Sequence, residues 1–110
     1  VQIGLGSSSK NAPQILELIG LLDVFATVVD GNRITLSKPD PAVFLLGARD
    51  LRLAPAECLV FEDASAGVEA AHAGGFPVIG IGSPEVLGAA DAVLPGFEGQ
   101  TWDSVRSLLA

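Results

Sequence analysis

A short apolar run at residues 58–61 ends abruptly at two acids, Glu62 and Asp63, and a stretch rich in Ser, Ala and Gly follows. This pattern predicts a buried parallel strand that passes directly into a helix. All-parallel sheets belong to α/β folds, and open sheets of this kind carry their chemistry at the carboxyl ends of the strands. Two carboxylates at such an edge pack poorly and suit a hard cation such as Mg²⁺, so the pair is the first candidate for an active site.

The alternation of strand and helix continues along the whole chain. Turn signals and β-branched runs predict strands at residues 1–6, 25–29, 58–61, 77–82 and 92–94. Capping residues and helical spacing predict helices at 12–19, from Pro41 with Asp40 as N-cap, at 65–73, and from Thr101 through Leu109. Strands that alternate with helices form βαβ units, and no linker divides the 110 residues. We therefore expect one α/β domain built around a parallel sheet.

Composition limits the binding partners and the cellular compartment that the sequence is compatible with. The net charge of −7 argues against nucleic acid or an anionic membrane surface as a partner. Cys58 is the only cysteine, so an intrachain disulfide is impossible, and its place in an apolar run predicts an unreactive buried thiol. The sequence has neither a long uninterrupted apolar segment nor a signal peptide pattern. These features predict a protein of the cytoplasm with no membrane association.

A run of hydroxyl and amide donors follows the first predicted strand, at Ser7, Ser8, Ser9, Lys10 and Asn11. Donors at the start of a helix suit an anion, because backbone N–H groups and the helix dipole point outward there. The alternative is a serine-rich turn that only caps the helix. Three serines followed by Lys and Asn nevertheless supply more donors than a cap requires.

Lys38 stands between Ser37 and Pro39, and the proline restricts the backbone that carries it. A lysine held in this way presents a point charge that suits a phosphoryl oxygen. The alternative is an ordinary solvated lysine on the surface.

The acid pair also has a simpler interpretation, as an N-cap with a favourable dipole interaction. One acid would serve that purpose, and Asp63 lies nearer the helix than Glu62. We expect the serine run, Lys38 and the acid pair to follow strands and to meet at one edge of the sheet. Donors, a lysine and a metal site together are the components of phosphoryl transfer. No nucleophile is evident, and the lone histidine, His72, is expected to be a surface or partly buried helix residue.

Four motifs occur in the order and spacing of the haloacid dehalogenase superfamily: Gly-Ser-Ser-Ser-Lys-Asn-Ala at 6–12, Val-Asp-Gly-Asn at 29–32, Ser-Lys-Pro-Asp-Pro at 37–41 and Val-Phe-Glu-Asp at 60–63. The chain resembles this superfamily over essentially all of its length, and within it the β-phosphoglucomutase group. The resemblance implies a three-layer, Rossmann-like parallel sheet. It also implies Mg²⁺-dependent phosphoryl transfer on a small phosphorylated sugar, a hexose phosphate, through an aspartyl-phosphate.

The resemblance assigns roles to individual residues. Ser7 would bind the phosphoryl group, and Lys38 would stabilise the aspartyl-phosphate. Asp63 would be a direct Mg²⁺ ligand, with Glu62 beside it as a ligand or a supporting residue. The substrate-binding residues would be Lys38 together with the serine run and the two residues that follow it: Ser7, Ser8, Ser9, Lys10 and Asn11.

The resemblance also places part of the site outside this sequence. The family's nucleophilic aspartate lies in an Asp-x-Asp motif on an earlier strand, which a helical cap domain follows, and neither is present here. That strand would lie between the strand that ends at Ser7 and the strand that ends at Asp63. The sequence also lacks Met and begins within a strand pattern. We therefore expect residues 1–110 to be a partial core whose sheet lacks its middle, inactive without the N-terminal portion of the same protein.

Three alternatives remain beside a phosphomutase. A phosphatase of the same superfamily is the nearest alternative: the Ser-Lys-Asn run and the Val-Asp-Gly-Asn turn favour the phosphoglucomutase group, but the choice depends largely on the absent cap and acid/base aspartate. A non-catalytic fragment would follow if these residues were the whole protein. A phospho-receiver domain is disfavoured because its acids precede its Lys-Pro pair, whereas here Lys38 precedes Glu62.

Overall fold

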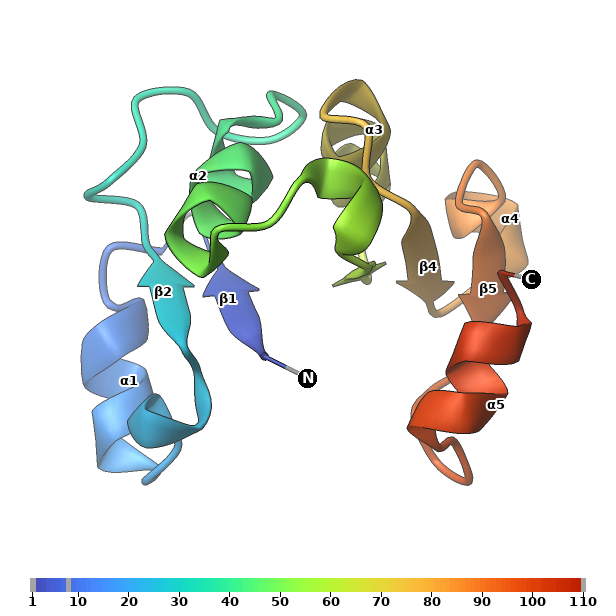
Figure 1. Cartoon of the computed structure of the whole chain (residues 1–110), viewed down its shortest axis with the longest axis horizontal. Coiled ribbons are helices and arrows are strands. Elements are labelled where there is room, and N and C mark those ends of the chain that lie inside the picture. The colour runs from blue at the N-terminus through green and yellow to red at the C-terminus, as the bar shows by residue number, and fades with distance from the viewer. Residues whose placement is uncertain (1, 8, 110) are drawn as a thin grey trace.

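The computed structural model describes residues 2–7 and 9–109, and within them five short parallel strands form two separate sheets (Figure 1). In the first sheet, β1 (Gly4–Gly6) pairs with β2 (Thr27–Val29). In the second, β4 (Val78–Ile81) lies between β3 (Val60–Glu62) and β5 (Ala92–Leu94). Every pairing is parallel, which confirms the α/β class with a parallel sheet.

The helices lie where the capping signals predicted them, with small differences at their ends. They are α1 (Ala12–Leu18), α2 (Ala42–Leu51), α3 (Ser65–Ala73), α4 (Pro84–Leu87) and α5 (Trp102–Ser107), with 3₁₀ turns at Leu22–Val24 and Pro55–Glu57. The sequence did not predict α4, which is a single turn. The prediction of Asp40 as N-cap was wrong by one residue, because Pro41 takes that position. The Asp40 carboxylate still accepts a hydrogen bond from the Ala42 amide, at 2.9 Å.

Helices cover both faces of the second sheet. Successive strand residues point to opposite faces, so Val60 and Glu62 share one face of β3 while Phe61 lies on the other. Val60 packs in the cluster that includes Val68 of α3. Phe61 instead lines a cavity with Trp102 and Val105 of α5. The second sheet therefore lies between α3 and α5, as a three-layer fold requires.

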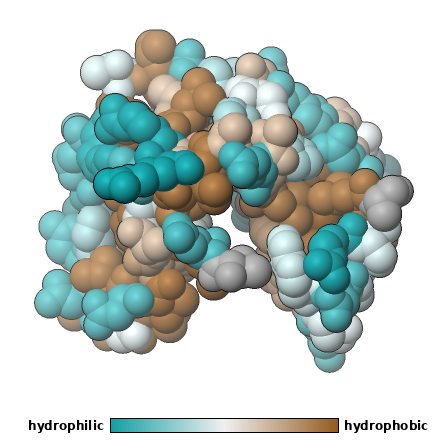
Figure 2. Space-filling model, viewed as in Figure 1, coloured by the Kyte–Doolittle hydropathy of each residue, from teal (hydrophilic) through white to brown (hydrophobic). Residues whose placement is uncertain are grey.

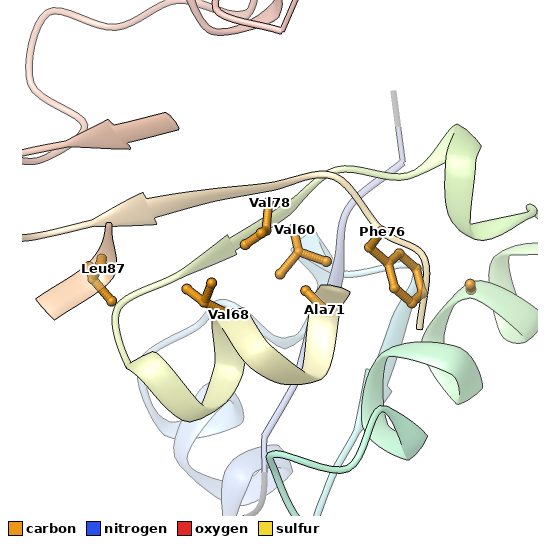
Figure 3. Packing of buried hydrophobic residues seen from close by; sticks show 7 residues of the cluster. Val60, Val68, Ala71, Phe76, Val78 and Leu87 are labelled. Carbon is orange, nitrogen blue, oxygen red and sulfur yellow. The ribbon is translucent and has the colours of Figure 1, made fainter. Parts of the chain in front are cut away.

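The main hydrophobic core lies between α3 and the second sheet. Figure 3 shows how its side chains converge on α3, with Val60 and Val78 from the strands and Phe76 at the end of the cluster. Gly75 follows α3 with a φ of +84°, a left-handed conformation that glycine adopts readily at the end of a helix. The buried members of the cluster are Ala48, Val60, Val68, Ala71, Phe76, Val78 and Leu87.

Helices α2 and α3 join the two sheets. Helix α2 packs against β1 and β2, and it also contacts α3. The Phe44 ring of α2 meets Phe76 edge to face, with the ring centroids 6.0 Å apart. Between the sheets themselves the surface is hollowed, and hydrophobic residues line the hollow (Figure 2). Within the described residues β1 pairs only with β2 and β3 only with β4, so the expected gap in the middle of the sheet is present.

Close packing of α2 on the first sheet depends on the small residues of β1. A Cβ atom built on Gly6 would lie 3.0 Å from Val43 Cγ2 and 3.6 Å from two atoms of the Phe44 ring. Glycine thus allows the strand and the helix to approach each other at the end of β1, directly before Ser7. None of the helices formed by residues 2–7 and 9–109 has the length and hydrophobicity needed to cross a membrane.

Candidate functional site

Glu62 is the last residue of β3, and its side chain is only 8% exposed. One carboxylate oxygen, Oε2, accepts a hydrogen bond from Lys38 Nζ at 2.8 Å. The other, Oε1, accepts hydrogen bonds from the backbone amides of Asp63 and Ala64, both at 3.1 Å. A buried carboxylate is costly unless it is paired and hydrogen-bonded, and here three donors satisfy it. Glu62 therefore holds Lys38 and the turn before α3 in place at once.

Lys38 approaches Glu62 from the loop before α2, and its peptide bond to Pro39 is cis. Its ammonium also lies 5.0 Å from the centroid of the Phe44 ring, a cation–π distance. Its side chain is 21% exposed, and an ammonium carries three donors, of which the Glu62 contact takes one. Lys38 was expected directly after a strand, but it lies in a turn well beyond the end of β2 at Val29.

Asp63 follows Glu62 at the carboxyl end of β3, two residues before the start of α3, and it is exposed. Its backbone is fixed by the amide contact with Glu62, while no hydrogen bond or ion pair of its carboxylate occurs within the described chain. The two acids that stand together in the sequence thus have different environments. Glu62 is engaged inside the protein, and Asp63 faces solvent.

The loop after β1 is ordered by its own hydroxyl groups. The Ser7 amide continues the sheet by donating to the Val29 carbonyl at 2.8 Å. The Ser9 amide donates to Ser7 Oγ at 3.1 Å, and the Asn11 amide donates to Ser9 Oγ at 3.2 Å. Both hydroxyl oxygens act as acceptors, which leaves their O–H groups available as donors. Ser8, also a predicted site residue, lies outside the described residues.

A second turn, after β2, holds this loop from the side. The Gly31 amide donates to the Ser9 carbonyl and Asn32 Nδ2 donates to the Lys10 carbonyl, each at 3.1 Å. The buried Asp30 side chain fixes the turn, since its Oδ1 accepts from the Asn32 amide at 2.8 Å. The motif at 29–32 therefore positions the donor loop, a role that its local sequence did not indicate.

The Phe44 ring lies between the two parts of the candidate site, the end of β1 before Ser7 and the Lys38 ammonium. The ring lies against Gly6, at the end of β1, and beneath the Lys38 ammonium. No hydrogen bond or ion pair in the described part of the chain links the Ser7 loop directly to Lys38 or Glu62. The structure thus joins Lys38, Glu62 and the Asp63 turn by direct contacts, and it brings the Ser7 loop near them through an aromatic ring.

The carboxylates present suit a partial site for Mg²⁺. In residues 2–7 and 9–109 no three His, Cys, Asp or Glu side chains gather closely enough to hold a metal ion by themselves. Mg²⁺ is usually bound by one or two carboxylates together with phosphate oxygens and water. The exposed Asp63 carboxylate fits one such position. Glu62 is oriented inward by Lys38 and two amides, so its contacts favour a supporting role over direct ligation.

A cavity of about 230 Å³ lies on the opposite face of the second sheet and does not belong to this site. Phe61 faces it and stacks edge to face with Phe97, at 5.3 Å between the centroids. The residues that line it carry no ionisable side chain: Phe61, Phe97, Gln100, Thr101, Trp102 and Val105.

The remaining predicted residues take ordinary structural positions. Cys58 is half-buried, and burial raises the pKa of its thiol, which disfavours the reactive thiolate. His72 lies on the exposed side of α3 with its Nε2 3.3 Å from the Asp91 carboxylate, as expected of a surface helix residue.

Comparison with known proteins relates this geometry to a family. The family model for haloacid dehalogenase-like hydrolases matches residues 2–75. A β-phosphoglucomutase of Bacillus subtilis is 40% identical over 109 residues, which is 99% of this chain and 46% of the relative. The fructose-1-phosphate phosphatase YqaB of Escherichia coli is 38% identical over 79 residues, which is 72% of this chain and 42% of the relative.

A crystal structure of a Clostridium difficile β-phosphoglucomutase superposes on the fold with a TM-score of 0.94 at 32% identity. The superposition covers 99% of this chain and 49% of the crystallised one. The chain spans about half the length of the relatives it matches, 46% and 42% for the two curated ones.

Proposed function

Because the chain belongs to the haloacid dehalogenase-like hydrolase family, we propose that the full-length protein is a β-phosphoglucomutase, which interconverts β-glucose 1-phosphate and glucose 6-phosphate. The observation that carries phosphoryl transfer is the arrangement at the end of β3, where buried Glu62 holds Lys38 beside the exposed Asp63. The choice of a mutase rests on the similarity to the Bacillus subtilis enzyme, which extends over 99% of the chain.

Each residue at this edge has a physical task in the proposal. Lys38 places a positive charge where negative charge spreads during transfer, and Glu62 fixes that ammonium. Ser7 donates a hydrogen bond to the phosphoryl group, and the sugar phosphate is bound by Ser7, Ser8, Ser9, Lys10 and Asn11. Asp63 would hold Mg²⁺, which supplies charge neutralisation at the phosphoryl oxygens, with Glu62 supporting it.

The attacking atom comes from outside the described residues in this proposal. We propose that an aspartate on a strand of the N-terminal portion of the same protein forms the aspartyl-phosphate. The open edges of β1 and β3 leave room for such a strand, and it would bring the aspartate to the edge that carries Ser7 and Asp63.

The proposal is tested by assaying the full-length protein with β-glucose 1-phosphate and Mg²⁺ and by measuring both glucose 6-phosphate and inorganic phosphate. We expect glucose 6-phosphate as the product. Lys38→Met should lower kcat by about 10²–10³-fold, since it removes a preorganised charge from the transition state. Arg106→Met on the exposed side of α5 removes a cation far from the site and should leave kcat unchanged.

A sugar-phosphate phosphatase is the second candidate, and the 38% identity to the phosphatase YqaB favours it. Release of inorganic phosphate without glucose 6-phosphate would establish the phosphatase and exclude the mutase. A protein that converts β-glucose 1-phosphate to neither product would contradict the proposed substrate.

A further inference from the structure

Gly67 is the third residue of α3, and it is buried directly against the Glu62 side chain. A Cβ atom built on Gly67 would overlap with Cγ, Cδ and Oε2 of Glu62. Backbone conformation does not require glycine here, because the residue lies within a regular helix. Glycine inside a helix costs about 0.5–1 kcal/mol relative to alanine, so its presence calls for another reason.

Helix geometry supplies that reason. The Cα–Cβ bonds of a helix tilt toward its N-terminus, so a side chain in the first turn of α3 would extend toward the turn that contains Asp63 and Ala64. The Glu62 carboxylate already occupies this space, where its Oε1 accepts from both amides of that turn. The Glu62 carboxylate therefore occupies the space that a side chain at Gly67 would fill.

The overlapping atoms cannot move aside independently of the site. Oε2, one of the atoms that a methyl group would strike, is the partner of Lys38 Nζ. A displaced carboxylate would lose this ion pair, and the amides of Asp63 and Ala64 would lose their acceptor. The carboxylate is buried, so it has no neighbouring solvent position that preserves these contacts.

We propose that Gly67 is a positioning residue of the site, because its lack of a side chain seats Glu62 and thereby orients Lys38 and the backbone of Asp63. The role in catalysis rests on the proposed phosphoryl transfer, whereas the seating of Glu62 does not. The position of the Glu62 carboxylate, at the end of β3, thus depends on the absence of a side chain at Gly67 in α3.

The test compares Gly67→Ala with Gly47→Ala in the full-length protein. Gly47 also lies within a helix, and a Cβ there would sit 3.8 Å from Val29 Cγ2, an ordinary contact. The two variants thus add the same methyl group in the same secondary structure. We expect Gly67→Ala to lower kcat by about 10²-fold with KM little changed, because misplacing a catalytic group by about 1 Å costs this much. Gly47→Ala should retain the native kcat.

A spectroscopic readout separates this inference from the proposed activity. The amide proton resonances of Asp63 and Ala64 should shift in Gly67→Ala and stay in place in Gly47→Ala, whether or not the protein turns over sugar phosphate. Unchanged amide resonances together with an unchanged kcat would overturn the proposal. An inactive native protein with shifted resonances would refute the proposed function alone.

A double-mutant cycle covers the case in which Gly67→Ala folds poorly. Removing the carboxylate by Glu62→Ala creates room for the methyl group, so Gly67→Ala should have no further effect on folding or kcat in that background. The proposal fails if Gly67→Ala is as harmful in the Glu62→Ala background as in the native one. It also fails if the double variant does not fold while Glu62→Ala does.

Discussion

Glu62 and Asp63 are adjacent acids whose surroundings give them different tasks. An acid is rarely buried unless it is paired, and Glu62 meets this condition through Lys38, which is 24 residues away in the sequence. Asp63 remains exposed at the end of the same strand. The sequence identified both residues because two adjacent acids directly after an apolar run are visible without knowledge of the fold. It could not assign the pairing with Lys38, which depends on how the loop before α2 folds back onto β3.

The carboxylate of Asp50 predicts that the stability of the protein depends on pH. Asp50 Oδ2 accepts a hydrogen bond from Thr27 Oγ1 at 2.6 Å and pairs with Arg33 Nη2 at 2.8 Å. These hydrogen bonds, with Thr27 the larger contributor, lower the pKa of Asp50 below its ordinary value of 3.8. The ionised carboxylate therefore contributes stability above pH 3.8, and the contribution is lost as the pH falls through the lower folded-state pKa.

We expect Asp50→Asn to lower the free energy of unfolding by about 1 kcal/mol near neutral pH, because neutral hydrogen bonds replace charge-assisted ones. The difference from the native protein should shrink as the pH falls below 3.8. Urea denaturation at a series of pH values measures both effects. Asp23→Asn, at an exposed position of the first 3₁₀ turn, should change stability by less than about 0.5 kcal/mol. A penalty for Asp50→Asn that is independent of pH would contradict the argument.

At the scale of elements, the sequence predicted a helix end correctly where residues next to that end mark it. Helix α3 has the predicted bounds, Ser65–Ala73, because a turn precedes it and two glycines end it. Helix α5 begins after Thr101 as predicted, but it ends at Ser107, before Leu108 and Leu109. The one-turn helix α4 escaped prediction because four residues cannot display a helical period.

The cap of α5 provides a test at this scale. Thr101 Oγ1 accepts from the Ser104 amide at 3.1 Å, and Ser104 Oγ accepts from the Thr101 amide at 2.9 Å. Thr101→Ala should lower the free energy of unfolding by about 1 kcal/mol, since it removes the Thr101 hydroxyl and leaves the Ser104 amide without its acceptor. Thermal unfolding monitored by circular dichroism measures the loss. Thr35→Ala, in an exposed stretch of the loop before α2, makes the same chemical change outside a helix and should be close to neutral. Equal losses in the two variants would argue against the cap.

At the scale of the whole molecule, the two described sheets are connected by the packing of α2 on α3. Phe44 contacts Gly6 at the end of β1, the Lys38 ammonium, and the Phe76 ring that follows α3. Phe44 is partly buried against the main hydrophobic core. Its place between two sheets could not be predicted, because helical periodicity identifies a buried face and not the element that covers it.

Phe44→Ala should therefore loosen the first sheet from the second. We expect a loss of about 2–4 kcal/mol of stability, toward the lower end because Phe44 is only partly buried. Hydrogen exchange should reveal faster exchange of β1 and β2 amides than of β4 amides, relative to the native protein.

Phe97→Ala is the matched control for this experiment, since Phe97 also belongs to an edge-to-face pair but stacks on Phe61 of the second sheet alone. It should leave the exchange of β1 and β2 amides unchanged. Equal acceleration in both variants would show that Phe44 has no special place between the sheets.

The division into two sheets has a consequence for the order in which contacts form. The strands of the first sheet come from residues 4–29 and those of the second from residues 60–94, so each sheet is assembled from one contiguous stretch. Closing short loops costs less chain entropy than closing long ones, and contacts between neighbouring segments form faster. Each sheet can thus pair its strands from nearby segments. The docking of α2 on α3 then joins these two stretches and brings Lys38 to Glu62, so this edge of the site is complete only once both sheets have come together.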